Sequence, residues 1–535
     1  MPIADKRAVA LLGQLNVLEN QRSVWENHWQ ELADYICPRK ADITKRRTAG
    51  DKRTELIFDG TAIHAAEMLA ASLHGMLTNP STPWFSLKFK DRGLDGNDEA
   101  KEWLQGVTEV MYSAFHRSNF AEAVHELYSD LVVFGTGVMM VERDATTNLR
   151  FSTRHIGECF ISEDAEGRVN AVYRKFKMTC IAARETFGVE ALPTSMQKKA
   201  MEEPYTEVEF CHVVIPRDNY DPTKLDALNK PYASIYIDPE DKQIISEGGF
   251  DELPYMCPRW LKASFERGYG RSPAMTALAD TKMLSKMSEV TIRAAQKQVD
   301  PPLMLPDDGF MMPIRTVPGG LNFYRSGTRD RIEPLNTGAN NPLGLQMEEQ
   351  RRQAIRAAFY VDQLILGQGP QMTATEVIQR TEEKMRLLGP VLGRLQAELL
   401  QPLIERVFAV LTRQELFAPS PEFLQESDVE IEYVSPLAKA QRFGDIQSAM
   451  RLFESLAPLS QVNPGVFDYV DMDGLAKHII RVLGVPATVI KSDEQVVQER
   501  QQRQDQEAQA AEQQQIANQA QAMGDAAPMI KAIQQ

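Results

Sequence analysis

The chain has 535 residues, with 59 basic and 74 acidic side chains and a net charge of −15. This length exceeds one simple core, so several domains are expected, and the composition is that of an ordinary soluble protein. The acidic balance argues against a protein that grips DNA by counterion release, although it is compatible with a wall along which DNA slides.

The first half of the chain predicts helices followed by a mixed region. Apolar periodicity and capping residues predict helices over 6–36, 61–76, 98–116 and 121–134. Alternating patterns predict strands at 85–89, 138–142, 169–176, 207–215, 233–237 and 256–264, with short helices at 181–187 and 195–202. The fold class expected from this pattern is α+β and mainly helical.

A central excursion dominates the next part. Ser272 can cap a helix over 274–299 whose first turn holds Pro273, and Pro301 and Pro302 end that helix. Its Met283, Met287, Val290 and Ala294 recur at spacings of four and three, which predicts one apolar stripe. A run rich in Pro, Gly and Arg separates it from a second helix over 343–362. An excursion this long more plausibly packs against copies of the chain than within one subunit.

The remainder returns to helices. A glycine-rich loop at 367–370 leads to a long helix over 373–413, which Gly389-Pro390 and Pro402 should kink. A strand at 429–434 and helices over 437–456 and 472–483 follow. The Gln- and Ala-rich tail from residue 492 has helix propensity without an apolar stripe, so it is either a helix stabilised in an assembly or partly disordered.

Two features bear on the compartment. No apolar run approaches the roughly 20 residues needed to span a bilayer, and the N-terminus leads into an amphipathic helix instead of a signal-peptide core. The cysteines are scattered and form no C-x-x-C pair, so free buried thiols are expected at Cys37, Cys159, Cys180, Cys211 and Cys257. We therefore expect a protein that is made and kept in a cytosol, without a membrane partner.

Catalytic signatures are not found in the sequence. It holds no G-x-x-x-x-G-K-[ST], no H-E-x-x-H and no G-x-S-x-G, and its paired glycines lack the third glycine of a dinucleotide site. The histidines show no ligand spacing, and Tyr469 and Ile480 occupy positions that an EF-hand loop would need for ligands. We predict no enzyme activity, no catalytic residues, no metal and no cofactor.

An ordered set of short motifs resembles the portal (head-to-tail connector) proteins of short-tailed double-stranded DNA bacteriophages. None of these motifs is catalytic, and the resemblance depends on their order along about residues 20 to 490. They are FDGTA (58–62), LHGMLTNP (73–80), PWF (83–85), VFGTGVM (133–139), GYGRSP (268–273), MTATEV (372–377), GPVL (389–392) and GVP (484–486).

The resemblance implies a homo-oligomeric ring, usually a dodecamer, at one capsid vertex of the virion, assembled in the host bacterial cytoplasm. Such a ring would pass double-stranded DNA during packaging and ejection, and its partners would be terminase, major capsid and scaffolding proteins and tail adaptor proteins. The implied regions are a wing (1–270 and 375–435), two stem helices (271–300 and 343–362), a clip (301–342), a tunnel loop (363–374), a crown (436–491) and a helical barrel or flexible tail (492–535).

Several residues are candidates for contacts in such a ring. Arg293 and Lys297 lie four apart on the first stem helix, and Arg352 and Arg356 lie four apart on the second, so each pair shares a face that could meet DNA phosphates, a neighbouring subunit or solvent. In the clip, Arg315, Arg325, Arg329 and Arg331 could line a conduit mouth, bind an adaptor or form intersubunit ion pairs. In the tunnel loop, Gln368, Gly369 and Gln371 could press on DNA or lie in solvent. The alternative function is a scaffolding or other coat protein without a DNA channel.

Overall fold

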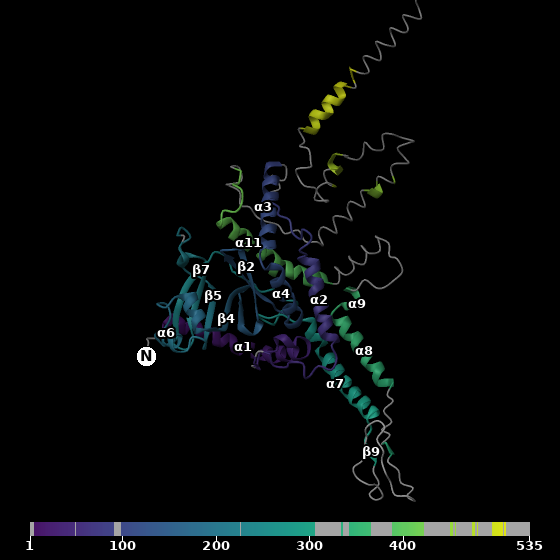
Figure 1. Cartoon of the computed structure of the whole chain (residues 1–535). Coiled ribbons are helices and arrows are strands. Elements are labelled where there is room, and N and C mark those ends of the chain that lie inside the picture. Colours follow the sequence, from purple (N-terminus) through teal and green to yellow (C-terminus); the bar gives the residue numbers. More distant parts are fainter. Residues whose placement is uncertain are drawn as a thin grey trace, which may run out of the picture. The chain divides into compact units, whose positions relative to one another are not determined.

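The computed structural model describes most of the first 421 residues and short pieces beyond them (Figure 1). The described residues are 5–45, 47–48, 50–89, 98–224, 226–304, 333–334, 342–364, 388–421, 450–452, 455, 473–476, 479, 495–506 and 508–509. The chain forms two compact units: one comprises Met1–Phe85 and Met111–Leu416, and the other Ser86–Val110 and Phe417–Gln535. Within the described residues, no helix combines the length and apolar character needed to cross a membrane.

The predicted N-terminal helices are confirmed within two residues at each end. They are α1 (Lys6–Ile36), α2 (Thr61–Leu77), α3 (Asp98–Arg117) and α4 (Phe120–Phe134), with a 3-10 turn at Pro38–Lys40 after α1. Local chemistry sets their ends, because Asp5 accepts a hydrogen bond from the Arg7 N–H at 2.8 Å and Gly135 ends α4 at φ 78°. The boundary between the two units runs through α3.

The strand predicted at 85–89 is wrong, since these residues are irregular. A single side chain accounts for the difference at Phe85. The Tyr112 hydroxyl accepts a hydrogen bond from the Phe85 N–H at 2.6 Å and donates one to the Phe85 carbonyl oxygen at 2.7 Å. Trp84 packs its ring against Phe115 at 5.5 Å, so aromatic contacts and this hydroxyl take the place of strand pairing.

An antiparallel five-stranded sheet forms the main β layer of the first unit. Its order is β3 (Cys159–Glu163), β4 (Val169–Thr179), β5 (Glu207–Pro216), β6 (Tyr232–Asp238) and β7 (Gln243–Phe250). One core packs α1 on the sheet through Ala8, Leu11, Leu15, Val213 and Ile235. A second core packs the helices α5 (Cys180–Phe187) and α6 (Thr194–Glu202) against other sheet residues. The predicted strands at 169–176, 207–215 and 233–237 and both short helices are confirmed, whereas β3 and β7 were not predicted.

A smaller sheet connects α4 to the excursion. It has the order β2 (Asn148–Arg154), β1 (Val138–Asp144) and β8 (Tyr255–Met256). The strand predicted at 256–264 is therefore wrong beyond Met256, and only the isolated bridges Thr136↔Arg259 and Leu261↔Arg271 continue it. Pro258 has no N–H to donate, and its carbonyl instead accepts from the Gly137 N–H at 3.1 Å.

The excursion is a helical hairpin, with α7 (Pro273–Val299) leading out and α8 (Pro342–Ala358) leading back, side by side (Figure 1). Between them, β9 (Leu303–Met304) pairs antiparallel with β10 (Glu333–Pro334). The second helix was predicted to continue to 362, but it breaks after Ala358, where Tyr360 has φ 58°, and resumes as α9 (Val361–Leu364).

The long helix predicted over 373–413 is described from residue 388. Residues 388–395 are α-helical, Gln396–Leu400 form a π turn, and α11 runs from Gln401 to Arg413. The π turn lies just before Pro402, whose missing N–H cannot continue an α-helical ladder. The start of this helix near Thr373 and the predicted kink at Gly389-Pro390 depend in part on residues 365–387, which lie outside the described residues.

The second unit is described in pieces. In it, the Trp103 indole N–H donates to the Ala418 carbonyl at 3.0 Å, and Arg500 forms an ion pair with Asp473 at 2.5 Å. Residues 495–506 are helical, and stabilisation of the tail in an assembly stays a prediction. The strand predicted at 429–434 and most of the helices predicted over 437–456 and 472–483 lie outside the described residues. The five cysteines, all in the first unit, are free and buried, as predicted.

Candidate functional site: the α7–α8 hairpin

The base of the hairpin is built on two glycines that face each other. A Cβ atom on Gly135 would lie 2.3 Å from the Gly270 carbonyl oxygen, and one on Gly270 would lie 2.6 Å from the Gly135 carbonyl oxygen. The Thr136 hydroxyl accepts the Gly270 N–H at 2.8 Å, and the Ser272 hydroxyl donates to the Val133 carbonyl at 2.8 Å. Two glycines in sequence-distant motifs thus hold the start of α7 against the end of α4.

The first turn of α7 forms as the sequence predicts. Ser272 has an extended backbone, its hydroxyl accepts the Met275 N–H at 3.0 Å, and Pro273 follows in the first turn. The helix packs on α1, α2, α4 and α8 along one face of small residues. The buried residues of that face are Ala274, Ala277, Leu278, Thr281, Leu284, Ser285 and Ser288.

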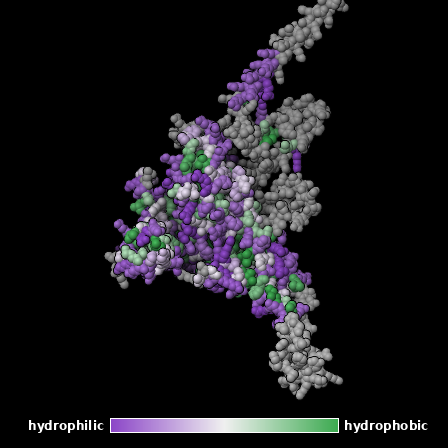
Figure 2. Space-filling view, in the orientation of Figure 1, coloured by the Kyte–Doolittle hydropathy of each residue, from purple (hydrophilic) through white to green (hydrophobic). Residues whose placement is uncertain are grey.

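The predicted apolar stripe exists, but it points away from this packed face. At 100° per residue, Met283, Met287, Val290 and Ala294 lie on the opposite side of α7. Met283 remains 49% exposed and Val290 56% exposed. Figure 2 shows apolar side chains gathered on the hairpin surface. The stripe is therefore uncovered in a single subunit, while the subunit's own contacts use mostly alanines and serines, which a search for large apolar residues overlooks.

A basic face runs beside the apolar stripe. Arg293 and Lys297 were predicted from their spacing, and Lys282 and Lys286, which were not singled out, continue the same face toward the base of α7. The signal was a second pair of basic residues four apart, which precedes the first pair by two helical turns. Glu289 lies within this band, 2.8 Å from the Lys286 ammonium and 2.6 Å from the Arg293 guanidinium.

These neighbours change the charge state of the band. The hydrogen bond from Lys286, aided by Arg293, lowers the pKa of Glu289 below its ordinary value and keeps that carboxyl ionised. Lys282 lies 3.2 Å from Glu31 of α1, whereas Lys297 is exposed near the outer end of the helix. The band therefore carries four cations interleaved with carboxylates, which reduces its net positive charge.

The second predicted pair has a different setting. The Arg352 guanidinium is 3.0 Å from Asp59 and 3.2 Å from Glu348, and Arg356 lies 3.8 Å from Glu349. Burial by itself would raise the pKa of Asp59, but hydrogen bonds from Thr61 and Arg352 outweigh burial and lower that pKa. Arg352 thus ties α8 to the start of α2, and its charge is matched within the subunit.

Polar contacts also join the two helices of the hairpin. The Thr291 hydroxyl donates to Glu348 at 2.6 Å, and Glu348 is only 3% exposed. Nearer the base, Arg351 of α8 forms an ion pair with Asp280 of α7 at 2.7 Å. These contacts fix the register of α7 against α8, since each bond has one donor and one acceptor at a defined height along the helices.

The structure does not describe the other predicted contact residues. Arg315, Arg325, Arg329 and Arg331 of the predicted clip, and Gln368, Gly369 and Gln371 of the predicted tunnel loop, lie outside the described residues. Of the predicted clip, 301–342, the structure describes the short strands β9 and β10, in which Met304 pairs with Glu333.

A buried ion cluster links the base of α7 to the π turn. Arg259 is 2% exposed, and Glu398 of the π turn accepts from its backbone N–H at 2.9 Å and from its Nε at 3.0 Å. Glu163 also bonds the Arg259 guanidinium and lies 2.6 Å from Lys262. Burial disfavours the Arg259 cation, but Glu398 and Glu163 outweigh burial and raise its pKa. Sequence reasoning did not find this cluster, because its members lie far apart in the chain.

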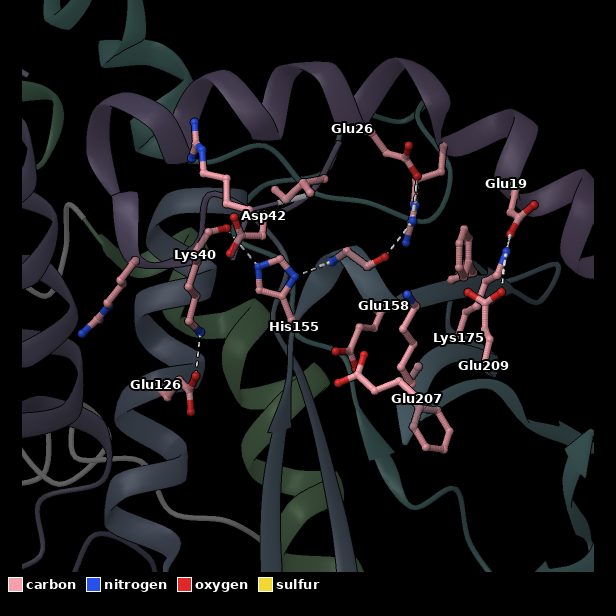
Figure 3. Close-up of a pocket in the computed structure, with 18 of the residues that line it drawn as sticks. Glu19, Glu26, Lys40, Asp42, Glu126, His155, Glu158, Lys175, Glu207 and Glu209 are labelled. Carbon is pink, nitrogen blue, oxygen red and sulfur yellow. Dashed lines mark hydrogen bonds and ion pairs between the residues drawn. The ribbon is translucent and has the colours of Figure 1, made fainter. Parts of the chain in front are cut away.

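A polar groove of about 1270 Å³ opens elsewhere on the first unit, between α1, α4 and the β-strands (Figure 3). Most of its charges pair with one another, as Lys40 does with Glu126 at 2.8 Å and Lys175 with Glu19 at 3.2 Å. Burial disfavours the Lys40 cation, but Asp130 and Glu126 outweigh burial and raise its pKa. Among the residues that the structure describes, no group of three His, Cys, Asp or Glu side chains is arranged to hold a metal.

Comparison with known proteins places this chain in a family. The family described as "Bacteriophage head to tail connecting protein" matches residues 8–490. A "Probable portal protein" of Bordetella phage BPP-1 is 35% identical over 95% of this chain and 93% of its own length. The "Portal protein" of Salmonella phage epsilon15 is 33% identical over 98% of this chain and 95% of its own length.

A more distant relative and a solved structure are also similar to the chain. The "Portal protein" of Enterobacteria phage T3 is 21% identical over 89% of this chain and 87% of its own length. A solved structure, "Neck of empty GTA particle computed with C6 symmetry", aligns with a TM-score of 0.37 at 10% identity, covering 75% of this chain and 89% of its own. The relatives named as portal proteins favour the connector over the scaffolding or coat-protein alternative. The chain belongs to the family of bacteriophage head to tail connecting proteins, the portal proteins of phages.

Proposed function

We propose that copies of this chain close into a ring, as a dodecamer at one capsid vertex, whose central channel passes double-stranded DNA during packaging and ejection. The role is structural, without catalysis or a cofactor. Terminase, major capsid and scaffolding proteins and tail adaptor proteins are the partners of such a ring, which assembles in the host cytoplasm and remains in the virion.

The observation that carries this proposal is the division of α7 into three faces. One face packs on the subunit through small residues, one carries the uncovered stripe of Met283 and Val290, and one carries the basic band that ends at Lys297. A helix in a closed ring needs these three kinds of contact: with its own subunit, with the neighbouring copy and with the DNA. Head-to-tail contacts between different faces close into a ring when the rotation fits.

The electrostatics of α7 suit DNA that moves. Lys282 and Lys286 face the carboxylates of Glu31 and Glu289, so phosphates would meet a band that is partly neutralised. Affinity for DNA rises with the number of phosphates that cations neutralise, and a strongly basic wall would therefore retain the duplex. A weakly basic band on a chain of net charge −15 would orient the duplex without holding it.

The other regions of the proposed ring follow from the hairpin. α7 and α8 form the stem, and residues 301–342 form the clip, with its arginines available to adaptor proteins or neighbouring copies. The tunnel loop is 363–374, and its Gln368, Gly369 and Gln371 are uncharged at a position facing the duplex. Residues 1–270 and 375–435 form the wing, 436–491 the crown, and 492–535 a helical barrel or tail. Arg352 contributes to the stem as a tie to Asp59 in this proposal, and not as a DNA contact.

Charge reversal on the basic band tests the DNA contact. We expect rings that carry Arg293→Glu and Lys297→Glu to assemble normally and to package less DNA, measured as full heads per ring in a packaging reaction. Lys6→Glu with Arg184→Glu is the control, because both side chains are exposed, on α1 and α5, and the change in net charge is the same. If intact rings of this double variant packaged as much DNA as the wild type, the basic band would not line the channel. Loss of rings would instead assign the face to a subunit contact.

A further inference from the structure

An exposed aromatic side chain marks the loop that precedes α7. Phe265 is 82% exposed and Leu261 is 47% exposed, although both are large and apolar. Residues 261–271 carry three basic side chains and one acidic one, and Arg267 beside Phe265 is exposed. The loop thus presents an apolar knob beside an exposed arginine, a combination that is typical of protein–protein contacts.

The knob is held in a defined conformation. Leu261 and Arg271 bridge the loop through both backbone hydrogen bonds, at 3.2 and 2.7 Å. The Arg271 Nε donates to both Glu266 carboxylate oxygens, at 2.9 and 3.0 Å, and Lys262 is anchored to Glu163 at 2.6 Å. Because the loop is already ordered in the free subunit, binding through Phe265 loses little conformational entropy.

A surface of opposite charge lies in the segment 201–207. Met201 is 75% exposed and Tyr205 is 78% exposed. The same segment contains Glu202, Glu203 and Glu207, all exposed, and no basic residue. It is ordered as well, since the Ile181 N–H donates to the Pro204 carbonyl at 2.9 Å and the Cys180 N–H to the Thr206 carbonyl at 3.0 Å.

The two surfaces lie at opposite ends of β4. Strand β3 ends at Glu163, which anchors Lys262 of the knob and pairs with Val169 at the start of β4. The segment 201–207 leads into β5, whose first residue, Glu207, pairs with Thr179 at the end of β4. β4 has eleven residues from one end to the other, so its ends are about 33 Å apart at about 3.3 Å for each of the ten steps between residues. One subunit therefore cannot bring its own two surfaces together.

We propose that the 261–267 loop of one copy docks on the 201–207 segment of the next copy. The Phe265 ring packs on Met201 and Tyr205, and Arg267 faces Glu202 and Glu203. The two surfaces are complementary, with apolar side chains at the centre and opposite charges at the rim. Because they lie at opposite ends of the subunit, the contact is heterologous and repeats around a ring. This inference rests on the proposed ring and adds a second contact to it, outside the α7–α8 hairpin.

Crosslinking in the full-length protein tests the contact. We expect the variant with Phe265→Cys and Tyr205→Cys, treated with a short bis-maleimide, to give a ladder of covalent multimers on a denaturing gel. The native thiols are buried, so the two new thiols are the accessible ones. Phe265→Cys with Val24→Cys is the control, because Val24 is also 78% exposed but lies on α1. Negative-stain images of each sample record whether rings are present.

The outcomes separate this inference from the ring itself. Rings without a ladder, or an equal ladder from the Val24 control, would overturn the contact and leave the ring proposal standing. An absence of rings in the wild-type protein under assembly conditions would instead overturn the ring and the contact with it.

A charge swap checks the pairing independently of the cysteines. Arg267→Glu or Glu203→Lys alone should raise the subunit concentration at half assembly about tenfold, and both changes in one chain should restore it. A double variant no better than the single ones would refute the pairing.

Discussion

The uncovered stripe on α7 supports a quantitative prediction about assembly. Full burial of a Val or Met side chain contributes about 1.5–3 kcal/mol. Because Met283 is 49% and Val290 56% exposed in the subunit, roughly half of that contribution is left for a neighbouring copy. Replacing both by serine should therefore remove about 2 kcal/mol from each contact between copies, which corresponds to about a 30-fold weaker association at each contact.

Mass photometry of a dilution series measures this effect as the subunit concentration at which rings dissociate. We expect the Met283→Ser and Val290→Ser double variant to require a higher concentration than wild type, with unchanged circular dichroism, because exposed substitutions leave the subunit's fold intact. Val17→Ser is the matched control, since Val17 is 55% exposed on α1. A double variant that assembles at the wild-type concentration would refute the assignment of the stripe to a subunit contact.

Three further predictions concern the stability of the subunit. Burial lowers the pKa of His212 to about 3, so between about pH 6.5 and about pH 3 only the unfolded chain binds this proton, and the free energy of unfolding should fall by about 1.4 kcal/mol per pH unit on acidification. Urea titrations at about pH 6 and about pH 4 should show a smaller loss of unfolding free energy for His212→Asn than for the wild type, and equal slopes would contradict the burial argument. Glu398→Gln removes one of the two carboxylates that balance the charge of Arg259, which is 2% exposed, and should lower the free energy of unfolding by about 3 kcal/mol. An unchanged melting temperature would show that the ion pair is dispensable. Asp59→Ala removes both the acceptor of the Thr61 N–H at the start of α2 and the partner of Arg352, and should lower the free energy of unfolding by about 2 kcal/mol. Hydrogen exchange should show the loss of protection at the start of α2, and wild-type protection there would contradict this prediction.

Local chemistry explains why the helices could be predicted. The cap at Ser272, the proline that follows it and the two prolines after Asp300 act within a few residues, so they set the ends of α7 whatever surrounds the helix. The same holds for α1, which begins after Asp5 and ends before Pro38. The family resemblance was likewise visible in ordered motifs, several of which contain glycines that the fold requires at close backbone approaches.

Edge strands and buried charges could not be predicted in this way. β3 and β7 have weak patterns of their own, and as the two edge strands of the sheet they are each defined by pairing with a single neighbour, β4 or β6. The partners of Arg259 illustrate the same limit, since Glu163 and Glu398 are brought to it only by folding. The spacing of Arg352 and Arg356 predicted a shared face correctly, but nothing in that spacing indicated that Asp59 would bind Arg352.

The amino-acid sequence by itself therefore determined the hairpin: its two helices, the breaks between them and the apolar and basic stripes along α7. These depend on the helical repeat, which is a property of the chain alone. The tertiary structure decided which stripe faces inward. Alanines and serines, with two leucines among them, form the packed face because small side chains allow the neighbouring helices to approach closely, and Met283 and Val290 are left outside. Which face of a helix is buried depends on the shape of its partners, and that information is spread over residues far apart in the sequence.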